Sequence, residues 1–203
     1  MRYAVDVWGV DVISVSFGFQ KGVPMLHDAV SYCAKKSIVF VAASCDPNPE
    51  SENWFAQHPD VIPVFATNDN GDPYARNPAP KKDQNNFAFP GYYRAKPSIS
   101  NLNPEVIAMS SGTCCAAPLA AGVGAVFLAQ LPGAVEQGLS NFGETFDLKQ
   151  FRKNLRTVSG MKAAFTAVSE ERRGYDCVQP WSAFEDKNVL QRIVQQILPT
   201  GSS

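Results

Sequence analysis

A glycine turn followed by two adjacent thiols is the part of the chain best suited to chemistry. Gly112 and Thr113 precede Cys114 and Cys115, and residues 114–131 are small and apolar. This composition predicts a helix with Cys114 in its first turn. The dipole and free amides of a helix N-terminus favour a thiolate and can donate hydrogen bonds to a developing oxyanion. The residues alone therefore leave two interpretations, a nucleophilic Cys114 or two buried structural cysteines.

Strands and helices alternate before this turn and must position it. Residues 11–17 and 38–43 are β-branched, apolar runs that predict buried strands, and residues 23–36 have helical spacing between them. A strand, a helix and a strand in succession predict a parallel sheet that is covered on both faces. The opening residues 2–9 predict a further helix.

The middle of the chain predicts long loops around short strands. Residues 44–104 are rich in Pro, Asn and Asp. Residues 61–66 are the strongest strand candidate there, although Pro63 favours a place at the edge of the sheet. Residues 105–109 predict a strand that leads into the glycine turn.

The sequence after Pro132 becomes more polar and predicts helices over residues 147–158, 160–170 and 186–198. We therefore divide the chain into a domain over residues 1–132 and a helical extension over residues 133–203.

The composition argues against several classes of protein. Lys and Arg total 18 against 19 Asp and Glu, whereas a nucleic-acid binder carries a basic excess. No apolar run approaches the length of a membrane span. The five cysteines are odd in number, and Asp6 falls where a signal peptide would be apolar. We expect a cytoplasmic chain with neither nucleic-acid nor membrane partners.

No cofactor or metal is predicted. Gly122 and Gly124 begin like a dinucleotide-binding motif, but the third glycine is missing and the pair falls inside a predicted helix. The two histidines and the scattered cysteines do not form a zinc-binding pattern.

Four segments, in order, resemble the subtilisin-like peptidases (subtilases). The turn and helix match the nucleophile motif Gly-Thr-Ser-x-Ala-x-Pro at Gly112, Thr113 and Pro118. The strand ending at Gly18, the strand end over residues 41–45 and the segment over residues 54–66 are similar to three further family segments. The likeness is closest to the subtilase domains of intracellular fungal proteins, which share a Gly-Tyr…Pro-Trp end.

The resemblance implies an α/β fold with a doubly wound parallel sheet in three layers, seen here as its C-terminal portion. It implies peptide-bond hydrolysis by a Ser-His-Asp triad on a peptide or protein substrate. It also implies a substrate cleft formed by two strand ends. The residues placed in that cleft are Ser16, Phe17, Gly18, Ala42, Ala43 and Ser44.

The chain departs from the family pattern where the chemistry occurs. Cys114 stands at the position of the nucleophilic Ser, and Cys45 stands at the position of the oxyanion-hole Asn. The loss of that Asn is worth about 3 kcal/mol, a figure measured on subtilisin itself. No Asp-Thr-Gly or His-Gly-Thr motif occurs, and His27 and His58 fall elsewhere. We therefore expect a serine endopeptidase domain by family that is inactive as this chain; the alternative is a non-catalytic pseudo-peptidase or protein-binding module.

Three further hypotheses follow from the same residues. Cys45 and Cys114 would converge on the cleft, where they either bind a metal or form a disulfide, or simply line a relaxed site. A cysteine peptidase would need His27 or His58 as its base. A sheet without the family's N-terminal strands would expose an edge, which predicts self-association.

Overall fold

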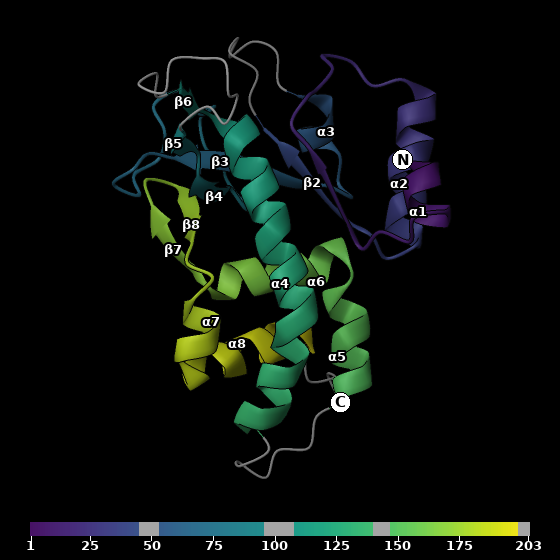
Figure 1. Cartoon of the computed structure of the whole chain (residues 1–203), viewed down its shortest axis with the longest axis vertical. Helices are drawn as coiled ribbons and strands as arrows, with labels where there is room; N and C mark the ends of the chain where they lie inside the picture. The colour runs from purple at the N-terminus through teal and green to yellow at the C-terminus, as the bar shows by residue number, and fades with distance from the viewer. Residues whose placement is uncertain (45–52, 96–107, 140–146, 199–203) are drawn as a thin grey trace.

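The computed structural model describes residues 1–44, 53–95, 108–139 and 147–198, and a six-stranded sheet forms its centre (Figure 1). In chain order the strands are β1 (Val12–Val15), β2 (Val39–Ala43), β3 (Ile62–Thr67), β4 (Phe87–Pro90), β5 (Tyr92–Ala95), β6 (Ala108–Ser111), β7 (Ser169–Arg172) and β8 (Tyr175–Val178). The helices are α1 (Arg2–Asp6), α2 (Pro24–Lys35), α3 (Trp54–Gln57), α4 (Thr113–Leu139), α5 (Leu148–Leu155), α6 (Val158–Ala167), α7 (Ser182–Glu185) and α8 (Lys187–Ile197).

The sheet is mostly parallel and has the strand order β1-β2-β3-β4-β8-β7. Strands β1 to β4 are parallel neighbours in chain order, β8 pairs parallel with β4, and β7 pairs antiparallel with β8. Strands β5 and β6 form a separate antiparallel pair. The predicted β1–α2–β2 crossover and the α/β fold class are confirmed.

The predicted place of Pro63 at the sheet edge is wrong, because β3 lies between β2 and β4. Pro63 pairs with Ala42 on β2, but pairing with β4 begins only at Val64. Pro63 therefore lies before the first residue of β3 that pairs with β4, so its missing N–H does not interrupt that ladder. The start of a strand is a tolerated position for proline in a sheet.

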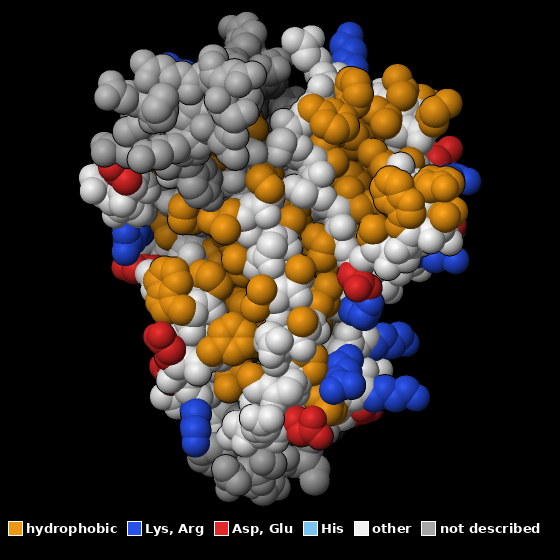
Figure 2. Space-filling model, viewed as in Figure 1, with side chains coloured by type: hydrophobic (Ala, Val, Ile, Leu, Met, Phe, Trp, Pro, Cys, Tyr) orange, Lys and Arg blue, Asp and Glu red, His pale blue; other side chains and the backbone are white. Residues whose placement is uncertain are grey.

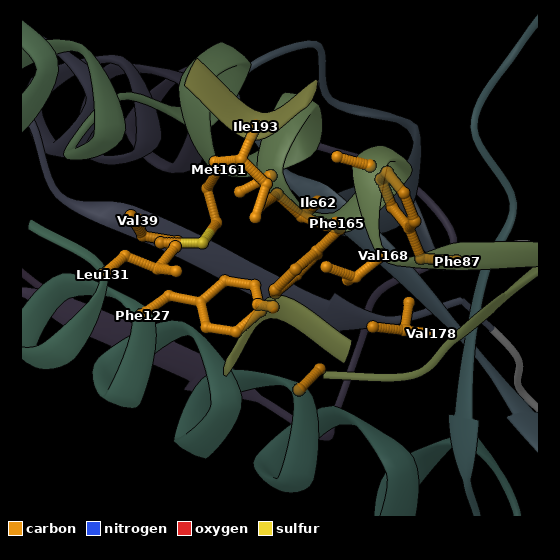
Figure 3. Packing of buried hydrophobic residues seen from close by; sticks show 14 of the residues in the cluster. Val39, Ile62, Phe87, Phe127, Leu131, Met161, Phe165, Val168, Val178 and Ile193 are labelled. Atoms are coloured by element: carbon orange, nitrogen blue, oxygen red, sulfur yellow. The ribbon is translucent and has the colours of Figure 1, made fainter. Parts of the chain in front are cut away.

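Side-chain alternation divides the core into two layers. Val39, Val41 and Ala43 of β2 face α4 in the larger cluster, whereas Phe40 and Ala42 face the other side with α2 and α3. Figure 3 shows the larger cluster from close by, with labelled side chains from the sheet, α4, α6 and α8.

Phe165 of α6 is central to the larger cluster. Its ring is fully buried and meets the rings of Phe87, Phe89 and Phe127 at centroid distances of 5.5, 5.3 and 5.9 Å. These contacts join the sheet, α4 and the helices that follow α4.

The region after residue 132 has two features that were not predicted for the helical extension. Helix α4 is 27 residues long and continues through Pro132 to Leu139. The three predicted helices are present as α5, α6 and α8, but β7 and β8 form a hairpin that the sequence analysis missed. Its turn holds Arg173 and Gly174 at φ 54° and 83°, the left-handed pair that a two-residue hairpin requires.

Helix α4 is apolar along its length. Residues Thr113–Gly138 are long and apolar enough to cross a membrane, and 33% of the most apolar window is buried. The expectation that no segment meets this criterion was wrong, because Ala and Gly join the larger apolar residues into a run whose first charged residue is Glu136. In the structure, α4 packs across β1, β2, β3 and β4, which is the place of a core helix.

The central ring cluster gives a prediction about stability. Phe165→Ala removes a fully buried ring and leaves a cavity, so we expect a loss of about 3–5 kcal/mol in the free energy of unfolding. Urea denaturation followed by circular dichroism measures this loss. The control is Phe184→Ala, at a ring that is 45% exposed; an equal loss in both variants would contradict the account of the core.

The edge strand gives a prediction about assembly. We propose that β1, which pairs only with β2 among the described strands, lets the chain self-associate through its outer edge. Lysine at the exposed Ser14 should shift the mass in sedimentation equilibrium toward the monomer, whereas the same charge added by Gln195→Lys on α8 should not. A wild-type chain that stays monomeric at high concentration would contradict the prediction.

Candidate functional site

The glycine turn places Cys114 on the surface at the beginning of α4. Gly112 has φ 125°, and its N–H donates to the Gly91 carbonyl at 2.8 Å. A residue with a side chain is strained at this φ, so the turn requires glycine. Thr113 is buried, and Cys114 is exposed. The predicted position of this thiol in the first turn of a helix is thus what the structure shows.

The residue that follows β1 contacts the backbone of Cys114. The Ser16 hydroxyl donates to the Cys114 carbonyl at 3.0 Å. Phe17 and Gly18, which follow Ser16, are exposed. The structure therefore brings Ser16, one of the residues predicted for the cleft, to the start of α4.

The end of β2 contributes in a different way. Ala42, Ala43 and Ser44 are buried, and the Ser44 hydroxyl donates to the Val64 carbonyl at 2.7 Å. These side chains belong to the interior, and the Ser44 N–H also donates to the Val64 carbonyl, at 3.0 Å. Cys45, predicted at the oxyanion position and as a partner of Cys114, lies outside the described residues.

Asn53 joins these two strand ends, and the sequence analysis missed it. Its Nδ2 donates to the carbonyl of Ala43 at 2.7 Å and to that of Phe17 at 3.3 Å. Its Oδ1 accepts from the N–H of Phe55 at 3.1 Å and so caps α3. An Asn directly before a short helical run is an N-cap signal, which could have identified the residue but not its two carbonyl partners.

Gly18 is needed because Asn53 occupies the space of a side chain there. A Cβ on Gly18 would lie 2.1 Å from the Asn53 Oδ1. The agreement of Gly18 with the family pattern thus has a direct steric reason in this chain.

Aromatic rings also pack against the loop over residues 17–19, which follows β1. The Phe55 ring of α3 is buried and meets the rings of Phe17 and Phe19 at 6.1 and 5.9 Å. The N–H of Trp54 donates to the Phe19 carbonyl at 2.8 Å. Phe17 and Phe19 are still 62% and 46% exposed, so they offer apolar surface beside Ser16. Figure 2 shows further hydrophobic surface over α1, α2 and α4.

The two histidines contact each other rather than Cys114. His58 is buried at the end of α3, and its Nε2 lies 3.2 Å from the Nδ1 of His27 on α2. Burial lowers the pKa of His58 below its usual 6.5, and His27 lowers it further, whereas the Asp60 carboxylate acts in the opposite direction. The structure therefore gives no hydrogen bond to support either histidine as a base for Cys114.

The Cys114 thiol has no hydrogen-bond partner among the described residues. Within those same ranges, His, Cys, Asp and Glu side chains form no cluster that could hold a metal ion. Near Cys114 the exposed Phe17 and Phe19 rings offer apolar surface, but no described group that could accept a proton is bonded to the thiol.

A shallow pocket lies on the sheet face opposite α4. It is lined by Ser44, Phe65, Lys81 and Gln84, among others, and not by Ser16 or Cys114. It is thus separate from the start of α4.

Comparison with known proteins identifies the fold. A model of the subtilase family (Peptidase_S8) matches residues 2–154. The solved prenylagaramide maturation protease PagA is 20% identical with a TM-score of 0.58, and the match covers 98% of this chain and 66% of that one. The patellamide maturation protease PatA is 22% identical with a TM-score of 0.57, over 94% and 66%. The PatG macrocyclase in complex with peptide is 16% identical with a TM-score of 0.54, over 98% and 55%.

A search of curated proteins finds no significant match. The chain spans 66% or less of the length of each of these three solved structures. Because their sequence identity to this chain is low, the structural likeness is evidence for the fold only. The predicted resemblance to the subtilases is confirmed by the family model and by the subtilisin-like α/β fold. The family match extends over most of the sequence, and the chain belongs to the subtilase family.

Proposed function

We propose that this chain is a subtilase-family domain that binds peptides in its cleft without hydrolysing them. The observation that carries the proposal is the environment of Cys114: an exposed thiol at the start of α4 with no base bonded to it among the described residues. Without a base, the thiol must rely on the helix terminus alone for activation.

The residue types at two positions support the same proposal. A thiol is larger than a hydroxyl in a site that the family shapes for oxygen, and misplacement of reacting atoms slows the reaction strongly. Cys45 offers a weak donor where the family has an amide. Both exchanges remove catalytic capacity and leave the cleft segments intact.

An active endopeptidase domain is the second candidate. The retained turn at Gly112 and the order of Ser16, Asn53 and Cys114 around one strand end favour it. It requires an Asp and a His from polypeptide beyond this sequence, so the present chain would be the C-terminal portion of such a domain.

We also propose kinship with the intracellular fungal subtilase domains and a cytoplasmic location. The Gly174-Tyr175 and Pro180-Trp181 pairs support the kinship. Among the described residues, Cys33, Cys114 and Cys177 form no disulfide with one another, which supports a reducing compartment.

The proposal predicts binding without turnover. The probes are fluorescein-labelled casein for hydrolysis and labelled casein peptides for fluorescence polarisation. We expect no hydrolysis above that of Cys114→Ala, together with peptide binding that Phe17→Ala weakens. Phe184→Ala, at a similarly exposed ring on α7, serves as the control. Hydrolysis by the wild type that Cys114→Ala abolishes would establish the second candidate instead.

The proposal also predicts an order of thiol reactivity. Burial raises the pKa of the Cys33 and Cys177 thiols, because it disfavours the thiolate. Limiting iodoacetamide at neutral pH should therefore alkylate the exposed Cys114 before either of them, as read by peptide mass spectrometry. Earlier alkylation of Cys33 would contradict the described position of Cys114.

A further inference from the structure

Helix α3 is attached at one end to the cleft and at the other end to a histidine pair. Asn53, its N-cap, holds the carbonyls of Phe17 and Ala43. His58, its C-cap, is 6% exposed. The helix itself is four residues long, so its caps Asn53 and His58 are only about 7.5 Å apart along its axis.

The hydrogen bonds around His58 define one tautomer. The Asp60 N–H donates to the His58 Nδ1 at 3.2 Å, so this nitrogen is an acceptor. Neutral His58 then carries its proton on Nε2 and donates it to the Nδ1 of His27. This arrangement satisfies both ring nitrogens of His58.

A second proton on the pair breaks this arrangement. On His58 the proton must go to Nδ1, which would then face the N–H of Asp60 as a second donor. On the Nδ1 of His27 it would face the N–H of His58. Either event places two donors against each other at the end of α3, a cost comparable to a lost buried hydrogen bond.

The charged and titratable groups around the pair come from three elements. His27 belongs to α2, Asp60 follows α3, and Lys162 of α6 interacts with Asp60. Burial is the largest influence on His58 and outweighs the Asp60 carboxylate, so the pKa of His58 is lowered. Neutral His58 therefore contributes fully to the stability of the folded state above pH 6.5. This contribution is lost as the pH falls from 6.5 through the lowered pKa of His58.

We propose that Asn53 is the positioning residue of the cleft, holding the ends of β1 and β2 in register for a peptide backbone, and that the His27–His58 pair makes this hold dependent on pH. The inference rests on the proposed peptide binding and adds its regulation. At neutral pH α3 is fixed and the cleft is formed. In acid the C-terminal end of α3 becomes less ordered, and Asn53 no longer donates its hydrogen bond to the Phe17 carbonyl. The exposed loop over residues 17–19 is then no longer held in one position.

The first test separates the positioning role of Asn53 from its role as a cap. Asn53→Asp keeps the Oδ1 acceptor that caps α3 and removes the Nδ2 donor to Phe17 and Ala43. We expect labelled casein peptides to bind about tenfold more weakly, since two hydrogen bonds that order the cleft are lost. Asp147→Asn, which makes the reverse exchange at the exposed N-cap of α5, is the control.

The second test follows the pH coupling by NMR and does not need a ligand. The chain has two histidines, so imidazole spectra contain two ring systems, which His27→Gln and His58→Gln assign. We expect the Gly18 and Phe19 amide shifts to follow the His58 titration in the wild type. In Asn53→Asp, His58 should still titrate while the Gly18 and Phe19 shifts no longer follow it.

The outcomes of the two tests are distinguishable. If the wild type binds no casein peptide but the amides follow His58, the proposed function fails and the coupling through α3 stands. If Gly18 and Phe19 stay unchanged while His58 titrates, the pH dependence is overturned, even if His58→Gln does not fold. Equal peptide affinity of Asn53→Asp and the wild type would overturn the positioning role.

Discussion

The close packing of α4 against the sheet is the constraint on which the rest of the structure depends. Ala116, Ala117 and Ala120 are fully buried against the strands, and their small side chains let the helix approach closely. Because α4 crosses β1 to β4 and begins at the glycine turn, this packing fixes Cys114 beside the end of β1. The same helix then carries Phe127 and Leu131 into the ring cluster around Phe165 (Figure 3).

The position of a nucleophile and the means to use it are separate properties here. The fold supplies the position through Gly112 and the start of α4. Catalysis needs in addition a proton acceptor within hydrogen-bond reach, and the described surroundings of Cys114 provide none. Family membership follows from the fold and its motifs, whereas activity follows from the groups in the site.

Much of the sheet could be predicted because its signals are local. The continuous apolar run of β2 indicated a strand buried on both faces, and all five of its residues are buried. Pro63 misled the prediction of strand order, since a proline early in an interior strand costs little when the next ladder starts one residue later. The β7–β8 hairpin was missed because charged residues fill β7, and Arg173–Gly174 was the signal that could have indicated its turn.

The site was less predictable, because its geometry depends on contacts between residues that are far apart in the sequence. Asn53 acts on Phe17 and Ala43 through their carbonyl oxygens, which carry no side-chain signature. His27 and His58 are 31 residues apart and meet only because α2 and α3 cover the same face of the sheet.

Hydrogen–deuterium exchange of the whole chain with and without casein peptides tests the central claim most directly. If the cleft binds a peptide backbone, protection should appear in the segment from Ser16 to Phe19, and the peptides should remain intact by mass spectrometry. Protection confined to the pocket around Lys81 and Gln84 would contradict the assignment of the cleft. Cleaved peptides would contradict the claim that this chain binds without hydrolysis.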